Sequence, residues 1–136
     1  MRYIGLDLGS RTLGIAISDR SGIIASSLTI IRHNENYNSL VPQVKQIIDE
    51  YKVDEIVLGF PKNMNNTIGP KGELSLQFKE MLEKEIKKEV HLVDERLSTK
   101  EATNLLISND TSRKKRKKVV DSMAATIILQ SYLDRK

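Results

Sequence analysis

An aspartate interrupts an apolar strand pattern near the start of the chain, in the stretch YIGLDLGS. Side chains alternate along a strand, so Asp7 shares one face with Gly5 while the aliphatic residues around it occupy the other face. Gly5 and Gly9 leave room for a ligand to approach the carboxylate closely. Because an unpaired buried carboxylate is costly, Asp7 either binds a ligand or accepts hydrogen bonds from the amides of the following turn, GSRT.

Two more acidic sites occur much later in the chain. The triplet DER ends an apolar segment, and functional sites gather at the strand ends of parallel α/β sheets. Asp94 and Glu95 point to opposite faces of a strand, so at most one of them faces Asp7, and Arg96 can equally hold the other in an ion pair. Asp121 begins an inward-facing helical stripe whose adjacent alanines allow close approach to a sheet. It can equally be a first-turn aspartate that complements the helix dipole.

The residue types of the chain restrict what these acids could do. The chain has no cysteine, which removes thiol nucleophiles and thiolate metal sites. Its two histidines, His33 and His91, are better explained as a surface residue and a sheet residue than as metal ligands. Carboxylates suit Mg²⁺ or Mn²⁺, and two such ions can activate water on one side of a phosphate and stabilise the leaving oxygen on the other. The acids therefore predict a metal site that acts on a phosphodiester.

The positive charge is concentrated in one stretch. The formal net charge is +4, yet one run holds six positive charges, so the rest of the chain is slightly acidic. Such a run suits a polyanion because each neutralised phosphate releases a counterion; the alternatives are a solvated loop and a sorting tag. Arg11 and Lys62, beside glycines at strand ends, are candidates to hold flanking phosphates. The run consists of Arg113, Lys114, Lys115, Arg116, Lys117 and Lys118.

Hydrophobic periodicity predicts an α/β fold that would position these residues. Three early strands with tight connections should form an antiparallel meander, and the two later strands, each preceded by a helix, should add in parallel through right-handed crossovers. The segment KNMNNTIGPKG reads as a polar loop. The expected sheet is therefore mixed and five-stranded, flanked by helices. We expect strands at 2–8, 12–19, 23–32, 54–60 and 89–95, and helices at 39–51, 74–86, 98–107 and 119–133.

The length and composition indicate one domain spanning residues 1–136. No apolar run approaches the roughly 20 residues of a membrane span, and the N-terminus lacks the apolar core of a signal peptide. The absence of cysteine fits a reducing compartment. These features predict a soluble cytoplasmic protein, with nucleic acid as partner and no membrane.

Four segments together carry a resemblance that each alone would not: IGLDLGSRTLGIAISD, LGFPKNMNNTIGP, VDERLST and KKVVDSMAA, in this order. The chain closely resembles the YqgF (RuvX-like) family of nucleases with a ribonuclease H-like fold, over nearly its whole length. The resemblance implies that Asp7, Glu95 and Asp121 are catalytic and hold a divalent metal, which favours Glu95 over Asp94. It implies processing of the 5′ end of pre-16S ribosomal RNA, with products that carry a 5′-phosphate.

Three alternatives remain at this point. Family members have also been labelled Holliday junction resolvases by similarity of fold; cutting two strands of a DNA junction in concert demands symmetry, whereas the expected state is a monomer or weak homodimer. A non-catalytic RNA-binding module is the second alternative, although all three acids are present. The stretch DLGSRTLGIA also resembles the first phosphate loop of actin-like ATPases and sugar kinases, but those folds close two domains around a nucleotide.

Overall fold

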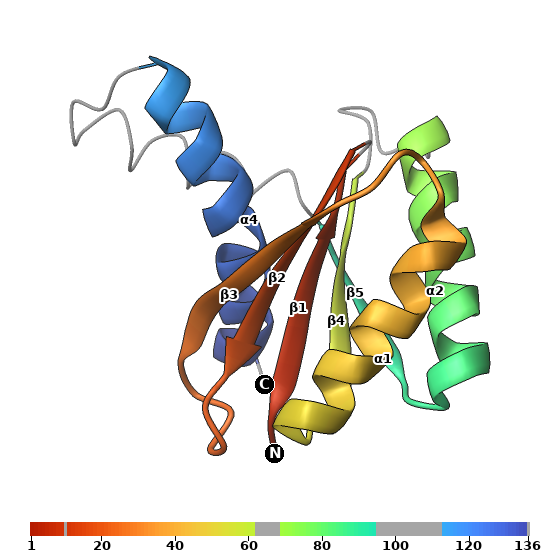
Figure 1. The fold of residues 1–136 in the computed structure, drawn as a ribbon. Coiled ribbons are helices and arrows are strands. Elements are labelled where there is room, and N and C mark those ends of the chain that lie inside the picture. Colours follow the sequence, from red (N-terminus) through yellow and green to blue (C-terminus); the bar gives the residue numbers. More distant parts are fainter. Residues whose placement is uncertain (10, 62–68, 95–112, 136) are drawn as a thin grey trace.

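A mixed five-stranded sheet forms the centre of the molecule, in the strand order β3-β2-β1-β4-β5 (Figure 1). The computed structural model describes residues 1–9, 11–61, 69–94 and 113–135, and over 113–122 it describes the backbone alone. The strands are β1 (Tyr3–Leu8), β2 (Thr12–Ser18), β3 (Ala25–Arg32), β4 (Glu55–Phe60) and β5 (Val90–Asp94).

The pairing of the strands confirms the predicted mixture of directions. β1 pairs antiparallel with β2, and β2 pairs antiparallel with β3. β4 adds parallel to β1, and β5 adds parallel to β4. As a result the carboxyl ends of β1, β4 and β5 meet at one end of the sheet, which is called the carboxyl end below.

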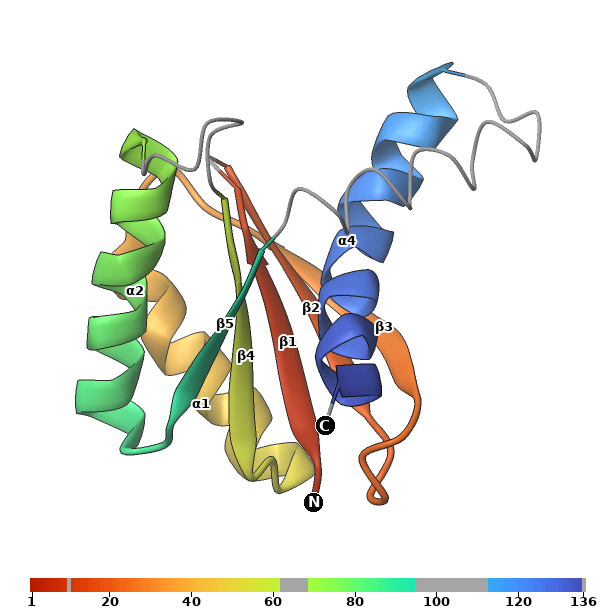
Figure 2. The same cartoon turned by 180° about the vertical axis from the view of Figure 1, so that it is seen from behind.

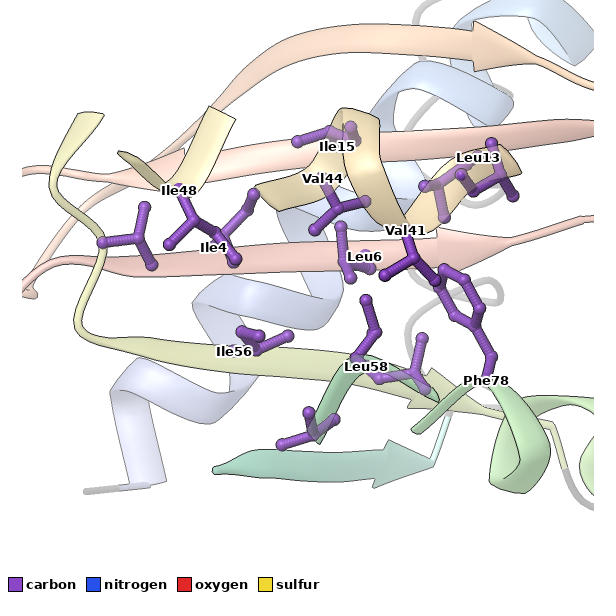
Figure 3. Close-up of a cluster of buried hydrophobic side chains, with 14 residues drawn as sticks. Ile4, Leu6, Leu13, Ile15, Val41, Val44, Ile48, Ile56, Leu58 and Phe78 are labelled. Carbon is purple, nitrogen blue, oxygen red and sulfur yellow. The ribbon is translucent and has the colours of Figure 1, made fainter. Parts of the chain in front are cut away.

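Two helices cover one face of the sheet, α1 (Leu40–Tyr51) and α2 (Pro70–Ile86), and a short 3₁₀ turn at Tyr37–Ser39 leads into α1. Alternate side chains of the central strands pack against them, and Figure 3 shows these side chains meeting beneath Val41, Val44 and Phe78. Every buried member of this core is apolar.

The last helix, α4 (Arg113–Arg135), covers the opposite face of the sheet (Figure 2). Its contact with β1 is unusually close, because Gly5 has no side chain: a Cβ built there would lie 2.7 Å from the Leu129 Cβ and 3.0 Å from the Ala125 carbonyl oxygen. Ala125, Ile128, Leu129 and Leu133 pack there against Tyr3, Ala16, Val57 and Val93. No helix in the described part of the chain is both long and apolar enough to cross a bilayer.

The starts of β3 and α2 differ from the sequence-based expectation. β3 begins at Ala25 rather than Ile23, because the Asp19 carboxylate accepts hydrogen bonds from the backbone N–H groups of Ile23 and Ile24 at 2.8 and 3.0 Å and holds them in the hairpin connection. Pro70 opens α2 instead of lying in a loop, since the first helical position does not need its missing N–H. The predicted helix at 98–107 lies outside the described residues.

The basic run is helical, which the sequence did not predict. α4 begins at Arg113 rather than Val119, so residues 113–118 make up its first turns. Lysine and arginine are good helix formers even where no apolar stripe marks the helix. The run therefore extends from a rigid element that packs on the sheet.

Candidate metal and nucleic-acid site at the carboxyl end of the sheet

Asp7 lies one residue before the end of β1, at the carboxyl end of the sheet and on the face that α4 covers. It is half-buried. Its partner on β2 is Gly14, and the parallel register of β1 with β4, in which Leu6 pairs with Leu58, puts Gly59 next to it on the other side. Neither neighbouring strand has a side chain at this level, so backbone bounds the space beside the carboxylate.

The turn after β1 is held by a histidine from the end of β3. The Gly9 N–H donates to the Thr12 carbonyl at 2.8 Å rather than to Asp7, and the His33 N–H donates to the Arg11 carbonyl at 2.9 Å. His33 Nδ1 accepts from the Glu35 N–H at 3.1 Å, so Nε2 carries the proton and donates to the Gly9 carbonyl at 3.0 Å. The prediction that His33 is a surface residue is wrong, because it is 8% exposed and clamps the turn.

Removing this clamp should destabilise the fold. We expect His33→Ala to lower the free energy of unfolding by about 1–3 kcal/mol, because the Gly9 carbonyl and the Glu35 N–H lose their buried partner. His91→Ala is a matched control, since its contact with Glu55 at 3.1 Å is partly exposed and should contribute less than about 1 kcal/mol. Urea unfolding of both variants measures the difference; equal losses would mean that the clamp adds nothing to stability.

Asp94 ends β5 and pairs with Phe60 of β4. Along β5, Val93 belongs to the core beneath α4. Because side chains alternate, Asp94 lies on the face opposite to that of Asp7. Glu95 and Arg96 lie outside the described residues.

The direction in which α4 crosses the sheet shows which end of the sheet Asp121 is nearer to. Leu129 and Ala125 cross β1 at Gly5, while Tyr132 contacts Tyr3 near the start of β1, with ring centroids 5.8 Å apart. α4 therefore runs opposite to β1, and Asp121, one helical turn or about 5.4 Å before Ala125, lies nearer the carboxyl end.

The structure describes some of the cations that were predicted to bind phosphates, but not all of them. Arg11 is exposed, in the turn that follows β1. Lys62 lies outside the described residues. The first turns of α4, which hold the basic run, extend past the sheet at its carboxyl end (Figure 1). The charge of the run therefore belongs to the end of the molecule where Asp7 lies.

Sequence comparison places the chain in a known family. Residues 1–135 match the profile of the family described as RuvX, Holliday junction resolvase. The chain belongs to this family. A relative from Geobacillus sp. (strain WCH70), 53% identical over 137 residues that span 100% of this chain and 99% of the relative, is named "Putative pre-16S rRNA nuclease". A relative from Bacillus cereus (strain B4264), 51% identical over 100% of both chains, has the same name.

Solved structures share the fold of this RuvX-family chain. Thermus thermophilus RuvC in complex with a Holliday junction matches 99% of this chain and 95% of its own, with a TM-score of 0.59 and 14% identity. The fowlpox virus Holliday junction resolvase matches over 100% of both chains, with a TM-score of 0.58 and 14% identity. These likenesses confirm the ribonuclease H-like fold. A ROK hexokinase from T. thermophilus has a TM-score of 0.50 and 19% identity over 75% of this chain, but only 38% of the hexokinase is matched.

A second group of possible metal ligands lies at the opposite end of the RuvX-family sheet. One ligand atom each from Glu55, Glu89 and His91 lies within 4.8 Å of the others. His91 Nε2 is 3.1 Å from a Glu55 oxygen and 3.9 Å from a Glu89 oxygen. Tyr132 stacks on the imidazole at 5.1 Å, and burial, followed by the Glu55 charge, raises the pKa of Tyr132. These residues sit where β4 and β5 begin, away from Asp7, and His91 is a sheet residue as predicted.

Proposed function

We propose that this RuvX-family chain is a divalent-metal-dependent nuclease, a single domain over residues 1–136, that hydrolyses phosphodiester bonds and processes the 5′ end of pre-16S ribosomal RNA. The observation that carries the proposal is the position of Asp7: a half-buried carboxylate, flanked by glycines, at the end of the sheet where α4 begins. The names of the relatives support a nuclease with this substrate.

The proposed metal ligands are Asp7, Glu95 and Asp121. Carboxylate oxygens are the donors that Mg²⁺ and Mn²⁺ prefer, and the absence of side chains at Gly14 and Gly59 leaves the Asp7 carboxylate accessible on its own face. The residues around Asp7 therefore fit a divalent ion. When bound there, such ions activate water and neutralise charge on the leaving oxygen. Of the three proposed ligands, Asp7 belongs to β1 and Asp121 to α4, while Glu95 follows β5 in the sequence.

Glu95 is proposed in preference to Asp94. Val93 lies under α4, on the same face as Asp7, whereas Asp94 lies on the other face. An alternating strand continued by one residue would carry Glu95 to the Asp7 face. The register of β5 thus supports the same choice as the family resemblance does.

The proposed nucleic-acid contacts are Arg11, Lys62 and the basic run at the start of α4. A helix that projects several cations past the sheet can contact several phosphates at once, and each contact releases a counterion. The basic run and Asp7 belong to the same end of the sheet. A substrate strand bound by the basic run would therefore also run close to the proposed metal ligands.

A four-way DNA junction is the second candidate substrate, because the family is described as a Holliday junction resolvase and RuvC shares the fold. The discriminating experiment incubates the protein with Mg²⁺ or Mn²⁺ and either a 16S precursor that retains its 5′ extension or a synthetic four-way junction. We expect metal-dependent trimming of the RNA. If only the junction is cleaved, the protein is a Holliday junction resolvase and not an rRNA nuclease. If RNA is bound but neither substrate is cleaved, the protein is a non-catalytic RNA-binding module.

A further inference from the structure

Arg32, the last residue of β3, lies on the same face of the sheet as Asp7. Asp7 pairs with Gly14 on β2, and Gly14 pairs with Ile30 on β3. Two residues farther along, Thr12 pairs with Arg32. Directly paired residues share a face, and so do residues two apart along a strand. Arg32 therefore lies on the same face of the sheet as Asp7.

The surroundings of Arg32 leave its charge available. Arg32 is exposed, and no ion pair joins it to a carboxylate among the residues that the structure describes. The backbone of Arg11, which is also exposed, lies next to this strand end, because the His33 N–H donates to the Arg11 carbonyl at 2.9 Å. An exposed guanidinium that has no carboxylate partner among the described residues is available to an anion from solvent. The planar fork of arginine matches a phosphate group in two hydrogen bonds.

We propose that Arg32 binds a phosphate of the substrate strand at the β3 side of the site, next to the turn that contains Arg11. β3 is two strand spacings, or about 10 Å, from β1, so the Arg32 guanidinium would hold a flanking phosphate and not the one that is cut. The clamp at His33 keeps the ends of β1 and β3 together, so both arginines are presented from one rigid element. This inference rests on the proposed nuclease function and names a residue that grips its substrate.

The test measures binding of a fluorescein-labelled single-stranded RNA oligonucleotide, with the sequence of the 5′ extension, over a series of KCl concentrations in metal-free buffer. The variants are Arg32→Gln and the matched control Arg20→Gln. Arg20 is also exposed, but it lies in the β2–β3 hairpin at the other end of the sheet, where its carbonyl accepts from the N-terminal amine at 3.0 Å. Both variants change the net charge by the same amount.

We expect Arg32→Gln to reduce the steepness of log Kd against log[KCl] by about 0.7, which corresponds to one phosphate contact on a single strand, while Arg20→Gln leaves it unchanged. Equal slopes for the wild type and Arg32→Gln, or equal changes in both variants, would overturn the assignment of Arg32 and leave the nuclease proposal standing. Failure of the wild type to bind RNA would overturn the RNA nuclease proposal and this inference together.

Discussion

Asp7→Asn should abolish metal-dependent cleavage while leaving the fold intact. We expect the rate to fall by more than about 100-fold, since loss of residues that merely orient metal ligands already costs 10–100-fold. Asparagine has nearly the same shape and retains the pairing of β1 with β2 through the backbone, so the free energy of unfolding should change by less than about 1 kcal/mol. Cleavage assays and urea unfolding on the same preparations measure both quantities.

A matched control for this variant is Asp49→Asn. Asp49 is exposed on α1, on the face of the sheet opposite to Asp7, and the substitution removes the same charge. It should cleave at the rate of the wild type. If Asp7→Asn retained activity, or if both variants lost it equally, Asp7 would not be a metal ligand in catalysis.

Gly5→Ala should damage both stability and activity, although Gly5 is not proposed to contact metal or substrate. The added methyl group would lie 2.7 Å from the Leu129 Cβ and 3.0 Å from the Ala125 carbonyl, so α4 must move away from β1. Such overpacking costs about 1–3 kcal/mol. Because Asp121 is on the same helix, one turn from Ala125, the shift should reduce cleavage by up to about 100-fold. Urea unfolding and cleavage assays in parallel measure the two effects.

Gly9→Ala separates helix displacement from the general effect of adding a methyl group. At Gly9 the nearest atoms are 3.2 Å away and belong to Thr12 in the turn, not to α4. We expect a smaller loss of stability than for Gly5→Ala. Equal stability losses, or a Gly5→Ala protein as active as the wild type, would contradict the account in which the close approach of α4 to β1 positions Asp121.

Much of the fold could be predicted from the sequence because its signals are local. Alternating apolar residues marked β1 and β2, and the polar turn between them required an antiparallel pair. The parallel direction of β4 and β5 followed from the helix that precedes each of them and from the right-handed crossovers this requires. The start of α4 could not be found in this way, since residues 113–118 have no apolar periodicity and only helix propensity favours them.

The surroundings of the candidate site were less predictable because they depend on register between strands. Gly14 and Gly59 lie beside Asp7 only because β2 and β4 pair with β1 at that level. The role of His33 likewise depends on the end of β3 meeting the turn after β1. The polar stretch HNEN favoured a surface position, and no feature of the local sequence indicates that the imidazole is buried against a carbonyl two strands away.

The group of Glu55, Glu89 and His91 also depends on register between strands, and it is a second place where a metal could bind. Its donors come from the starts of two adjacent strands and lie within 4.8 Å of one another. Imidazole with carboxylates suits manganese as well as zinc. A metal at this end of the sheet would be far from Asp7 and would not serve the proposed reaction.

Calorimetric titration of the protein with Mn²⁺ measures whether Asp7, Glu95 and Asp121 hold the metal. The variants are Asp7→Asn, Glu95→Gln and Asp121→Asn at the carboxyl end of the sheet, with Glu55→Gln and His91→Ala as controls at the other end. We predict that each of the first three weakens Mn²⁺ binding by at least about tenfold and that the two controls bind as the wild type does. Binding that survives Asp7→Asn and is lost in Glu55→Gln would contradict the account.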